Sequence, residues 1–362
     1  MKISIGIKPR EGPWGGGNQF ASSLTEYLKA KGIEVVHDLS KKDIDLILLA
    51  EPRKTSRSSA FTDSEIQDYL RHLNPDAIVV HRINECDERK GTKNVNLNLV
   101  MANKCADHTV FISTWLRDLF TGQGIQAVRS SIILNGADEN IFNTEGFSPW
   151  DHRGPLKIVT HHWGGNWLKG FDIYHQLDDL LERPEWRERL AFTYIGRIPE
   201  GFSFRNTRYI PPLSGTGLAS ELHRHHLYLT ASRNEPAGMH HIEGAMCGMP
   251  LLYIENGALP EYCQGFGISF TPETFISALE KMIQTYDCWV SEMSRYPHTA
   301  EKMCSEYYML FLDMLQKKKE ILLTRTLLPK PGILQTASFK TTMLKKKLRS
   351  FCKSILKREE KH

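Results

Sequence analysis

The sequence predicts an α/β protein of two doubly wound parallel domains that face a central cleft, followed by a basic helical tail. Short apolar runs alternate with amphipathic segments in both halves, which is typical of parallel sheets covered by helices. A charged, turn-rich stretch at 143–155 separates the halves and is expected to be the linker. The length of 362 residues is natural for two domains and a tail.

The first domain, 1–145, begins with the apolar run ISIGI. Its expected strands are 3–7, 44–50, 77–81, 108–112 and 131–134, and its expected helices are 18–31, 63–73 and 94–105. The second domain, 155–322, repeats this alternation with apolar runs at 157–162, 191–196, 227–232 and 251–255. Two Rossmann-like units are therefore the simplest arrangement, and such sheets bind ligands beyond the carboxyl ends of their strands.

The most informative segment is NEPAGMHHIEGAMCGMP, at 234–250. It interrupts the apolar run 227–232 with turn residues, and from Met239 its apolar residues recur at helical spacing. Glu235 is therefore expected on a strand-to-helix loop, with Glu243 about two turns further on. Free N–H groups of a first helical turn attract anions, and carboxylates accept hydrogen bonds from hydroxyl pairs, which sugars offer.

This segment resembles the Glu-x7-Glu signature of retaining glycosyltransferase family 4, whose members have the GT-B fold of two Rossmann-like domains. The resemblance implies that Glu235 and the following backbone amides contact the sugar of a nucleotide-activated donor, and that Glu243 binds ribose hydroxyls. The amides belong to Ala237, Gly238 and Met239. GALPEYC, at 257–263, looks like the Gly-rich segment of the family and places Glu261 at the same site. A solvated helix N-terminus is the simpler alternative, but it accounts for one acid only.

The loop THHWGGNWLKGFDIY, at 160–174, follows the first strand of the second domain. By the same resemblance, Lys169 and Gly170 match the lysine–glycine pair of the family, whose lysine neutralises the leaving diphosphate. The arginine that the family has in this loop is absent. Backbone amides of the glycine pair, or Arg197 from the next strand, are the candidates to complement Lys169.

The first domain contributes two candidate segments. The loop GPWGGGNQF, at 12–20, has three consecutive glycines that allow a backbone to approach a ligand, and the resemblance assigns Gly16 and Gly17 to the donor site. A flexible loop without a ligand is the alternative. His81 ends an expected strand and is a candidate contact to donor sugar and acceptor. A buried histidine with a backbone hydrogen bond is the alternative there.

The resemblance implies transfer of a sugar to a hydroxyl of a glycan or a lipid-linked acceptor, with retention of anomeric configuration. The expected catalytic residues are Glu235, Lys169 and His81. Since preorganised N–H dipoles and a lysine can stabilise a departing nucleoside diphosphate, we expect neither a cofactor nor a metal. The DID at 43–45 is better explained as the polar start of a strand than as a metal-binding motif.

The tail at 325–362 carries the positive charge of the chain. It has eleven Lys or Arg residues and two Glu, a formal charge of +9 that leaves −5 on the rest of a chain whose total is +4. Wound as a helix, 340–361 places four apolar residues on one stripe opposite basic ones, which favours contact with an anionic membrane surface. A solvated tail, or a helix packed on the body, is the alternative. Nucleic acid is not an expected partner, because stacking aromatics are sparse.

The expected location is the cytoplasm, with peripheral attachment to the inner face of the cell membrane. No apolar run approaches the roughly 20 residues that span a bilayer, and the chain starts with a strand rather than a signal peptide. Seven cysteines without a CxxC pair favour reduced thiols. Two other functions stay open: a nucleotide-sugar epimerase or hydrolase of related fold, and a non-catalytic sugar-nucleotide-binding protein.

Overall fold

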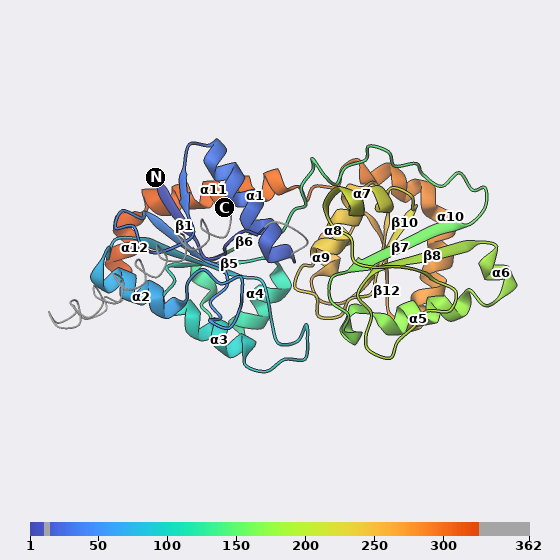
Figure 1. Ribbon diagram of the computed structural model, residues 1–362, viewed down its shortest axis with the longest axis horizontal. Coiled ribbons are helices and arrows are strands. Elements are labelled where there is room, and N and C mark those ends of the chain that lie inside the picture. The colour runs from blue at the N-terminus through green and yellow to red at the C-terminus, as the bar shows by residue number, and fades with distance from the viewer. Residues whose placement is uncertain (11–14, 326–362) are drawn as a thin grey trace, which may run out of the picture.

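The computed structural model describes residues 1–10 and 15–325, and the predicted membrane-binding segment 340–361 lies outside them. Two α/β domains lie side by side along the long axis of the molecule (Figure 1). Each is built on a six-stranded sheet in which all paired strands run parallel. The predicted fold class is confirmed.

The first sheet has the strand order β2-β1-β3-β4-β5-β6. Its strands are β1 (Lys2–Ile5), β2 (Glu34–Val36), β3 (Leu46–Leu49), β4 (Ile78–Ile83), β5 (His108–Phe111) and β6 (Ser130–Ile132). The helices of this domain are α1 (Gly16–Ala30), α2 (Asp63–His72), α3 (Val95–Asn103) and α4 (Thr114–Thr121). The order reverses between β1 and β3, so a crevice opens between the loops that follow these two strands.

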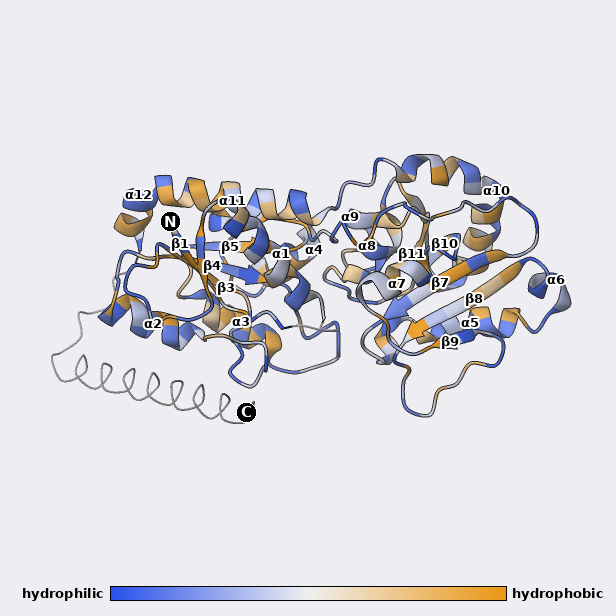
Figure 2. Cartoon of the chain, turned by 45° about the horizontal axis from the view of Figure 1, so that its top comes forward, coloured by the Kyte–Doolittle hydropathy of each residue, from blue (hydrophilic) through white to orange (hydrophobic). Residues whose placement is uncertain are grey.

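Neighbouring residues of the central strands pack into different cores. Leu46 and Leu48 of β3 lie in the core beneath α1, whereas Ile47 and Leu49 lie in the core beneath α2. The cause is the two-residue period of a strand, which sends successive side chains to opposite faces. Figure 2 shows these apolar strands at the centre of the domain. Burial on both faces explains why the strands are continuous apolar runs.

The second sheet has the order β12-β11-β10-β7-β8-β9. Its strands are β7 (Leu156–His162), β8 (Leu190–Gly196), β9 (Arg208–Ile210), β10 (Leu227–Thr230), β11 (Leu251–Ile254) and β12 (Gly267–Phe270). The helices are α5 (Phe171–Leu180), α6 (Pro184–Arg187), α7 (Gly215–Leu222), α8 (Met239–Met246), α9 (Leu259–Cys263) and α10 (Phe275–Met293). Here the order reverses between β7 and β10, and the crevice lies between the loops that follow them.

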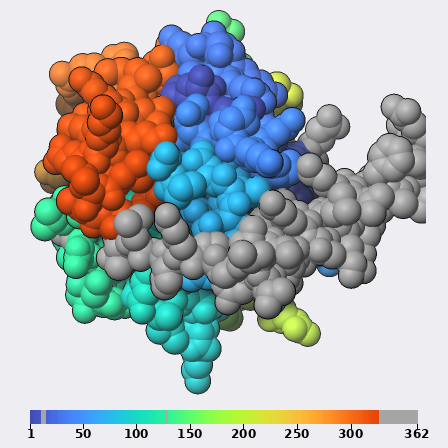
Figure 3. All heavy atoms as spheres, turned by 90° about the vertical axis from the view of Figure 1, so that its left-hand side faces the viewer, coloured from blue at the N-terminus to red at the C-terminus, as the bar shows by residue number. Residues whose placement is uncertain are grey.

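The chain then returns to the first domain. Helices α11 (Ala300–Gln316) and α12 (Lys318–Thr324) follow α10, and α11 buries its apolar face against α1 and the first sheet. Tyr307, for example, contacts the ring of Phe20 with centroids 5.1 Å apart. Figure 3 shows this late segment beside the beginning of the chain. The predicted second domain, 155–322, is therefore corrected: its last two helices pack on the first.

Candidate active site

A cleft of about 530 Å³ lies between the two domains, where the loops at the carboxyl ends of both sheets meet. The second domain lines it with the loops that follow β7 and β9, with the end of β8 and with the start of α8. The first domain lines it with the loops after β1, β3 and β4 and with the start of α1. The crevices of the two sheets thus face each other, and residues far apart in the sequence share one site.

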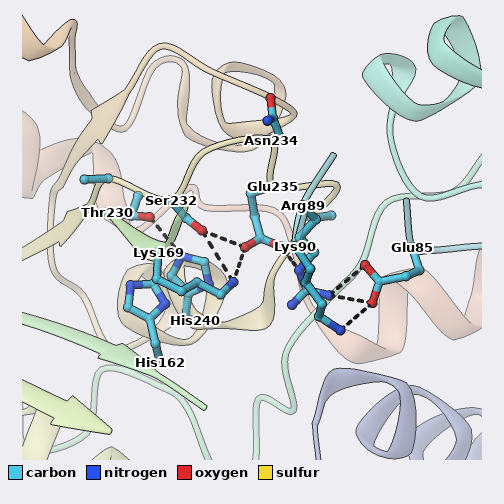
Figure 4. Close-up of polar contacts among 12 residues, drawn as sticks. Glu85, Arg89, Lys90, His162, Lys169, Thr230, Ser232, Asn234, Glu235 and His240 are labelled. Carbon is cyan, nitrogen blue, oxygen red and sulfur yellow. Dashed lines mark hydrogen bonds and ion pairs between the residues drawn. The ribbon is translucent and has the colours of Figure 1, made fainter. Parts of the chain in front are cut away.

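Glu235 is fully buried on the loop that follows β10, and three side chains hold its carboxylate (Figure 4). Lys169 Nζ lies 2.6 Å from Oε2, and the Ser232 hydroxyl donates to the same oxygen at 2.8 Å. Arg89 Nε lies 3.3 Å from Oε1. Burial favours the neutral acid, but the cations of Arg89 and Lys169 outweigh it and hold the pKa of Glu235 well below its ordinary value. The group is therefore a carboxylate at neutral pH.

Lys169 and Arg89 line the cleft, whereas Glu235 lies behind them. Lys169 ends a short 3₁₀ turn after β7, so this loop and the loop after β10 meet at the sheet crevice. Arg89 comes from the other domain, on the loop after β4. Both cations can therefore meet a ligand in the cleft while they remain beside a carboxylate that fixes their position.

Arg89 is a functional candidate that the sequence analysis missed. Its Nη1 lies 3.3 Å from Oε2 of Glu85, which also accepts a bond of 2.9 Å from Lys90 Nζ. A line of alternating charge thus crosses the cleft from Lys169 to Lys90 (Figure 4). The available signal was the charge-rich run at 85–90, directly after a predicted strand.

Glu243 is nearly buried on α8, where residues of both domains hold it. His161 Nε2 lies 2.7 Å from Oε2 of Glu243, and Gln19 of α1 donates to Oε1 at 3.0 Å. The other ring nitrogen of His161 lies 3.0 Å from the Tyr228 hydroxyl, so the imidazole is held from both sides. Glu243, His161 and Gln19 all line the cleft. The carboxylate is a fixed acceptor that ligand hydroxyls can reach.

Glycines allow two helix N-termini to meet at the cleft. Gly238 precedes the first turn of α8, and a Cβ there would lie 2.4 Å from His240 Nδ1 and 3.0 Å from the Glu235 carboxyl carbon. Gly16 begins α1, and its Cβ would lie 2.8 Å from Met239 Cγ. Gly17 lines the cleft beside it. The free N–H groups of both first turns therefore face the same space, as an anion requires.

Three predicted donor-binding residues have other surroundings. Gly170 has φ 96°, and a Cβ there would lie 2.4 Å from Ala231 Cβ, so it is needed for close packing on β10. Arg197 is exposed and stacks on Trp163 with its guanidinium 4.7 Å from the ring centroid. The carbonyl of Ala237 accepts a bond of 3.0 Å from Asn135 Nδ2 of the first domain. None of the three lines the cleft, although Trp163 does.

His81 is fully buried within β4 and does not line the cleft. Its Nδ1 lies 3.1 Å from Asn103 Nδ2 of α3, on the face of the sheet that α2 and α3 cover. Burial lowers the pKa of His81 to about 3. The catalytic role predicted for this histidine is therefore corrected. The strand period explains the difference, because it turns His81 into the sheet layer and away from the loops.

Glu261 also lies away from the cleft. Its carboxylate accepts two bonds of 2.7 Å from Thr114, one from the backbone N–H and one from the hydroxyl. Thr114 begins α4 of the first domain, so an acid at that helix N-terminus holds the domains together. The expectation that Glu261 belongs to the donor site is corrected accordingly.

Acid is expected to destabilise the protein through its buried histidines. Burial lowers the pKa values of His81 and His241 to about 3, against 6.5 in an exposed imidazole. Below pH 6.5 the unfolded state therefore binds more protons than the folded state, and the free energy of unfolding falls as the pH falls. His81→Gln should reduce that slope by about 1.4 kcal/mol per unit between pH 6 and 5. Urea unfolding at several pH values measures it, and an unchanged slope would contradict the assignment.

Within the described ranges, no three His, Cys, Asp or Glu side chains gather as a metal site requires. No helix of this part of the chain is long and apolar enough to cross a bilayer.

No protein-family model matches the sequence, and no curated protein matches it either. Solved structures do match. The catalytic domain of Arabidopsis thaliana starch synthase IV, bound to ADP and acarbose, aligns with TM-score 0.66 and 12% identity over 87% of this chain and 99% of its own. A glycosyltransferase from Rickettsia africae aligns with TM-score 0.60 and 12% identity, over 87% of this chain and 98% of its own. Anabaena HepE in complex with UDP-glucose aligns with TM-score 0.57 and 15% identity, over 90% of this chain and 100% of its own.

These likenesses establish the fold. Two Rossmann-like domains with parallel sheets, whose strand ends face a common cleft, define the GT-B fold, and this chain has it.

Proposed function

We propose that the protein is a glycosyltransferase that moves a sugar from a nucleotide-activated donor to a hydroxyl of a glycan or lipid-linked acceptor. The observation that carries this proposal is the Lys169–Glu235 pair, which lies at the crevice of the second sheet beside the open N-terminus of α8. The solved neighbours support the donor class, since one is in complex with UDP-glucose and another is bound to ADP.

The donor would span the wall that the second domain forms. Its diphosphate would lie against the first-turn amides of α8 and the ammonium of Lys169, both of which favour anions. The ribose hydroxyls would donate to Glu243, which His161 and Gln19 hold in place. In this placement α8 binds two parts of the donor, the diphosphate through its first-turn amides and the ribose through Glu243.

Arg89 would provide the second cation that the loop 160–174 lacks. A diphosphate attracts Lys169 and Arg89 from the cleft side and thus competes with Glu235 for both. Binding would loosen the pairs that cover the carboxylate and leave it free to accept hydrogen bonds from the sugar. Binding of the donor would thus itself free the carboxylate of Glu235, which stays covered by the two cations while the cleft is empty.

The chemistry needs stabilisation of the charge that develops on the leaving diphosphate. Two fixed cations and the amides of α8 can provide it, so the proposed reaction uses no metal. The acceptor hydroxyl would attack from the face that the diphosphate leaves, with retention of configuration as in family 4.

For the location, we propose the cytoplasm and the inner face of the membrane, with the segment 340–361 as the contact to anionic lipid. Turnover of soluble and lipid-linked acceptors should then differ, and equal turnover of both would count against the membrane role.

Binding of a nucleotide to the native protein is expected to raise its melting temperature, and a panel of nucleotides and nucleotide sugars tests this directly. One nucleoside diphosphate should give a selective shift. Glu243→Gln should reduce the shift strongly, because the ribose loses its charged, two-oxygen acceptor. The exposed Glu255→Gln serves as a control and should keep the shift. No shift with any nucleotide would contradict the proposal. Binding of donor without turnover across acceptors would support a non-catalytic binding protein, and turnover without any acceptor would support a hydrolase or epimerase.

A further inference from the structure

We infer that the acceptor is an anion, a sugar with a phosphate or carboxylate group near the hydroxyl that receives the new sugar. This inference rests on the proposed function, because it concerns the second substrate of the same cleft. The structural basis is a cationic wall on the first domain, opposite the donor groups.

The cationic wall comes from three loops of the first domain. Arg10 follows β1, Arg53 and Arg57 follow β3, and Arg89 and Lys90 follow β4; all five line the cleft. The same loops contribute two carboxylates to the lining, Glu51 and Glu85. The wall therefore has a formal charge of +3, and of +2 without Arg89, which the proposed function assigns to the donor, although the chain outside its tail is acidic. A concentration of cations in a cleft raises the local concentration of anionic ligands.

Three of these arginines lie at the crevice of the first sheet, where the strand order reverses between β1 and β3. They are Arg10, Arg53 and Arg57. Ligands of open α/β sheets bind at such a crevice. The crevice of the second sheet, with Lys169, faces it across the cleft and belongs to the donor in the proposed function. A transfer reaction needs a second substrate on the opposite side, so the arginines of the first crevice meet the acceptor.

The arginines differ in how the protein engages them. Arg53 forms a two-point pair with Glu51, with distances of 2.7 and 2.6 Å, and is neutralised. Arg10 donates to the carbonyl of Arg57, and its backbone is fixed by Asn18, which accepts a bond of 2.7 Å from the Arg10 N–H. The guanidinium of Arg57 is exposed and forms no ion pair or hydrogen bond with the residues that the structure describes. A ligand can therefore bind the Arg57 guanidinium without breaking an ion pair or hydrogen bond within the described part of the protein.

Arginine is suited to oxyanions. Its planar fork donates two parallel hydrogen bonds to a carboxylate or a phosphate, and a partly enclosed site strengthens them. The hydroxyls of a neutral sugar can accept only weaker hydrogen bonds from these donors, without the attraction between opposite charges. We therefore expect the negative charge of the acceptor to contribute more to its recognition than the arrangement of its hydroxyls.

The test compares three matched sugars as probes: glucose 6-phosphate, glucuronate and glucose. Ligand-observed NMR measures their dissociation constants for the native protein and for four variants, Arg57→Gln, the double variant Arg10→Gln/Arg57→Gln, Lys169→Met and Lys54→Gln. Lys54 is an exposed cation of the same loop that does not line the cleft, so it is the matched control.

At least one anionic sugar should bind at least tenfold more tightly than glucose, and added salt should weaken it. Arg57→Gln should remove most of this preference and the double variant all of it, whereas Lys54→Gln and Lys169→Met keep it. The stronger probe tells whether the natural group is a phosphate or a carboxylate. Equal binding of glucose, no binding of either anion, or anion binding unaffected by the double variant would overturn the inference. Binding lost in Lys169→Met and kept in Arg57→Gln would overturn it too, since the anion then lies at the donor phosphate site.

The two proposals fail separately. The nucleotide panel reports on the second domain through Glu243, and the sugar panel reports on the first domain through Arg57. A selective nucleotide shift without anion preference would leave the transferase and remove the anionic acceptor. Anion preference without any nucleotide shift would remove the transferase and leave only an anion-binding site on the first domain.

Discussion

Glu235→Gln is expected to lower the rate of sugar transfer by about 10²–10³, the effect of removing one preorganised charge from a site of this kind. The amide has nearly the shape of the carboxylate but not its charge, so the sugar loses its charged acceptor and one of the two acceptor oxygens becomes a donor. The same change leaves Lys169 buried without its partner, which costs about 3–5 kcal/mol of stability. Steady-state kinetics and urea unfolding measure the two effects.

The control is Glu255→Gln, an exposed glutamate just after β11 in the same domain. It should change neither rate nor stability by more than about 0.5 kcal/mol. A Glu235→Gln protein with native stability and native turnover would show that the buried carboxylate takes no part in the reaction.

Lys169→Met is expected to be the second most damaging change. The substitution keeps the apolar stem and removes the ammonium, so the leaving diphosphate retains one side-chain cation, Arg89. We expect kcat to fall by about 10². Stability should fall toward the lower end of about 3–5 kcal/mol, because Arg89 and Ser232 still hold Glu235.

Arg233→Gln provides the comparison for Lys169→Met. Arg233 is two residues from Glu235, but it pairs with Asp172 at a partly exposed position, with one bond of 2.8 Å. A pair of this kind contributes about 0–1 kcal/mol. If both substitutions proved equally mild, the buried cation would not be the one that the leaving group needs.

The fold could be predicted because parallel strands buried on both faces leave an unmistakable pattern of apolar runs. All nine predicted strands are present, with ends shifted by a few residues. The strands that the prediction lacks are β2, β9 and β12. The first two have three residues each and are partly exposed at sheet edges, so they carry no such run. The predicted boundary at 322 assigned the residues of α11 to the second domain, because their order along the chain does not show against which sheet they pack.

The positions of candidate site residues could be predicted where they depend on a local motif. Gly16, Gly17, Gly238 and Glu243 meet at the cleft as the motifs indicated, and Lys169 reaches it beside Glu235. The errors concern contacts between distant segments. Arg89 is 146 residues from Glu235 in the chain, and no spacing rule connects them. His81 was misplaced because the end of a strand predicts a loop, while the side chain follows the strand period.

Sugar transfer by this protein is measured by the release of nucleoside diphosphate from a panel of nucleotide sugars, with and without anionic and neutral acceptor sugars. We expect that one donor is consumed and that its consumption depends on an acceptor. Glu235→Gln should slow this consumption by about 10²–10³, whereas Glu255→Gln should not change it. No release from any donor with any acceptor, although the nucleotide binds, would contradict the proposed function. So would release at the same rate in Glu235→Gln and native protein.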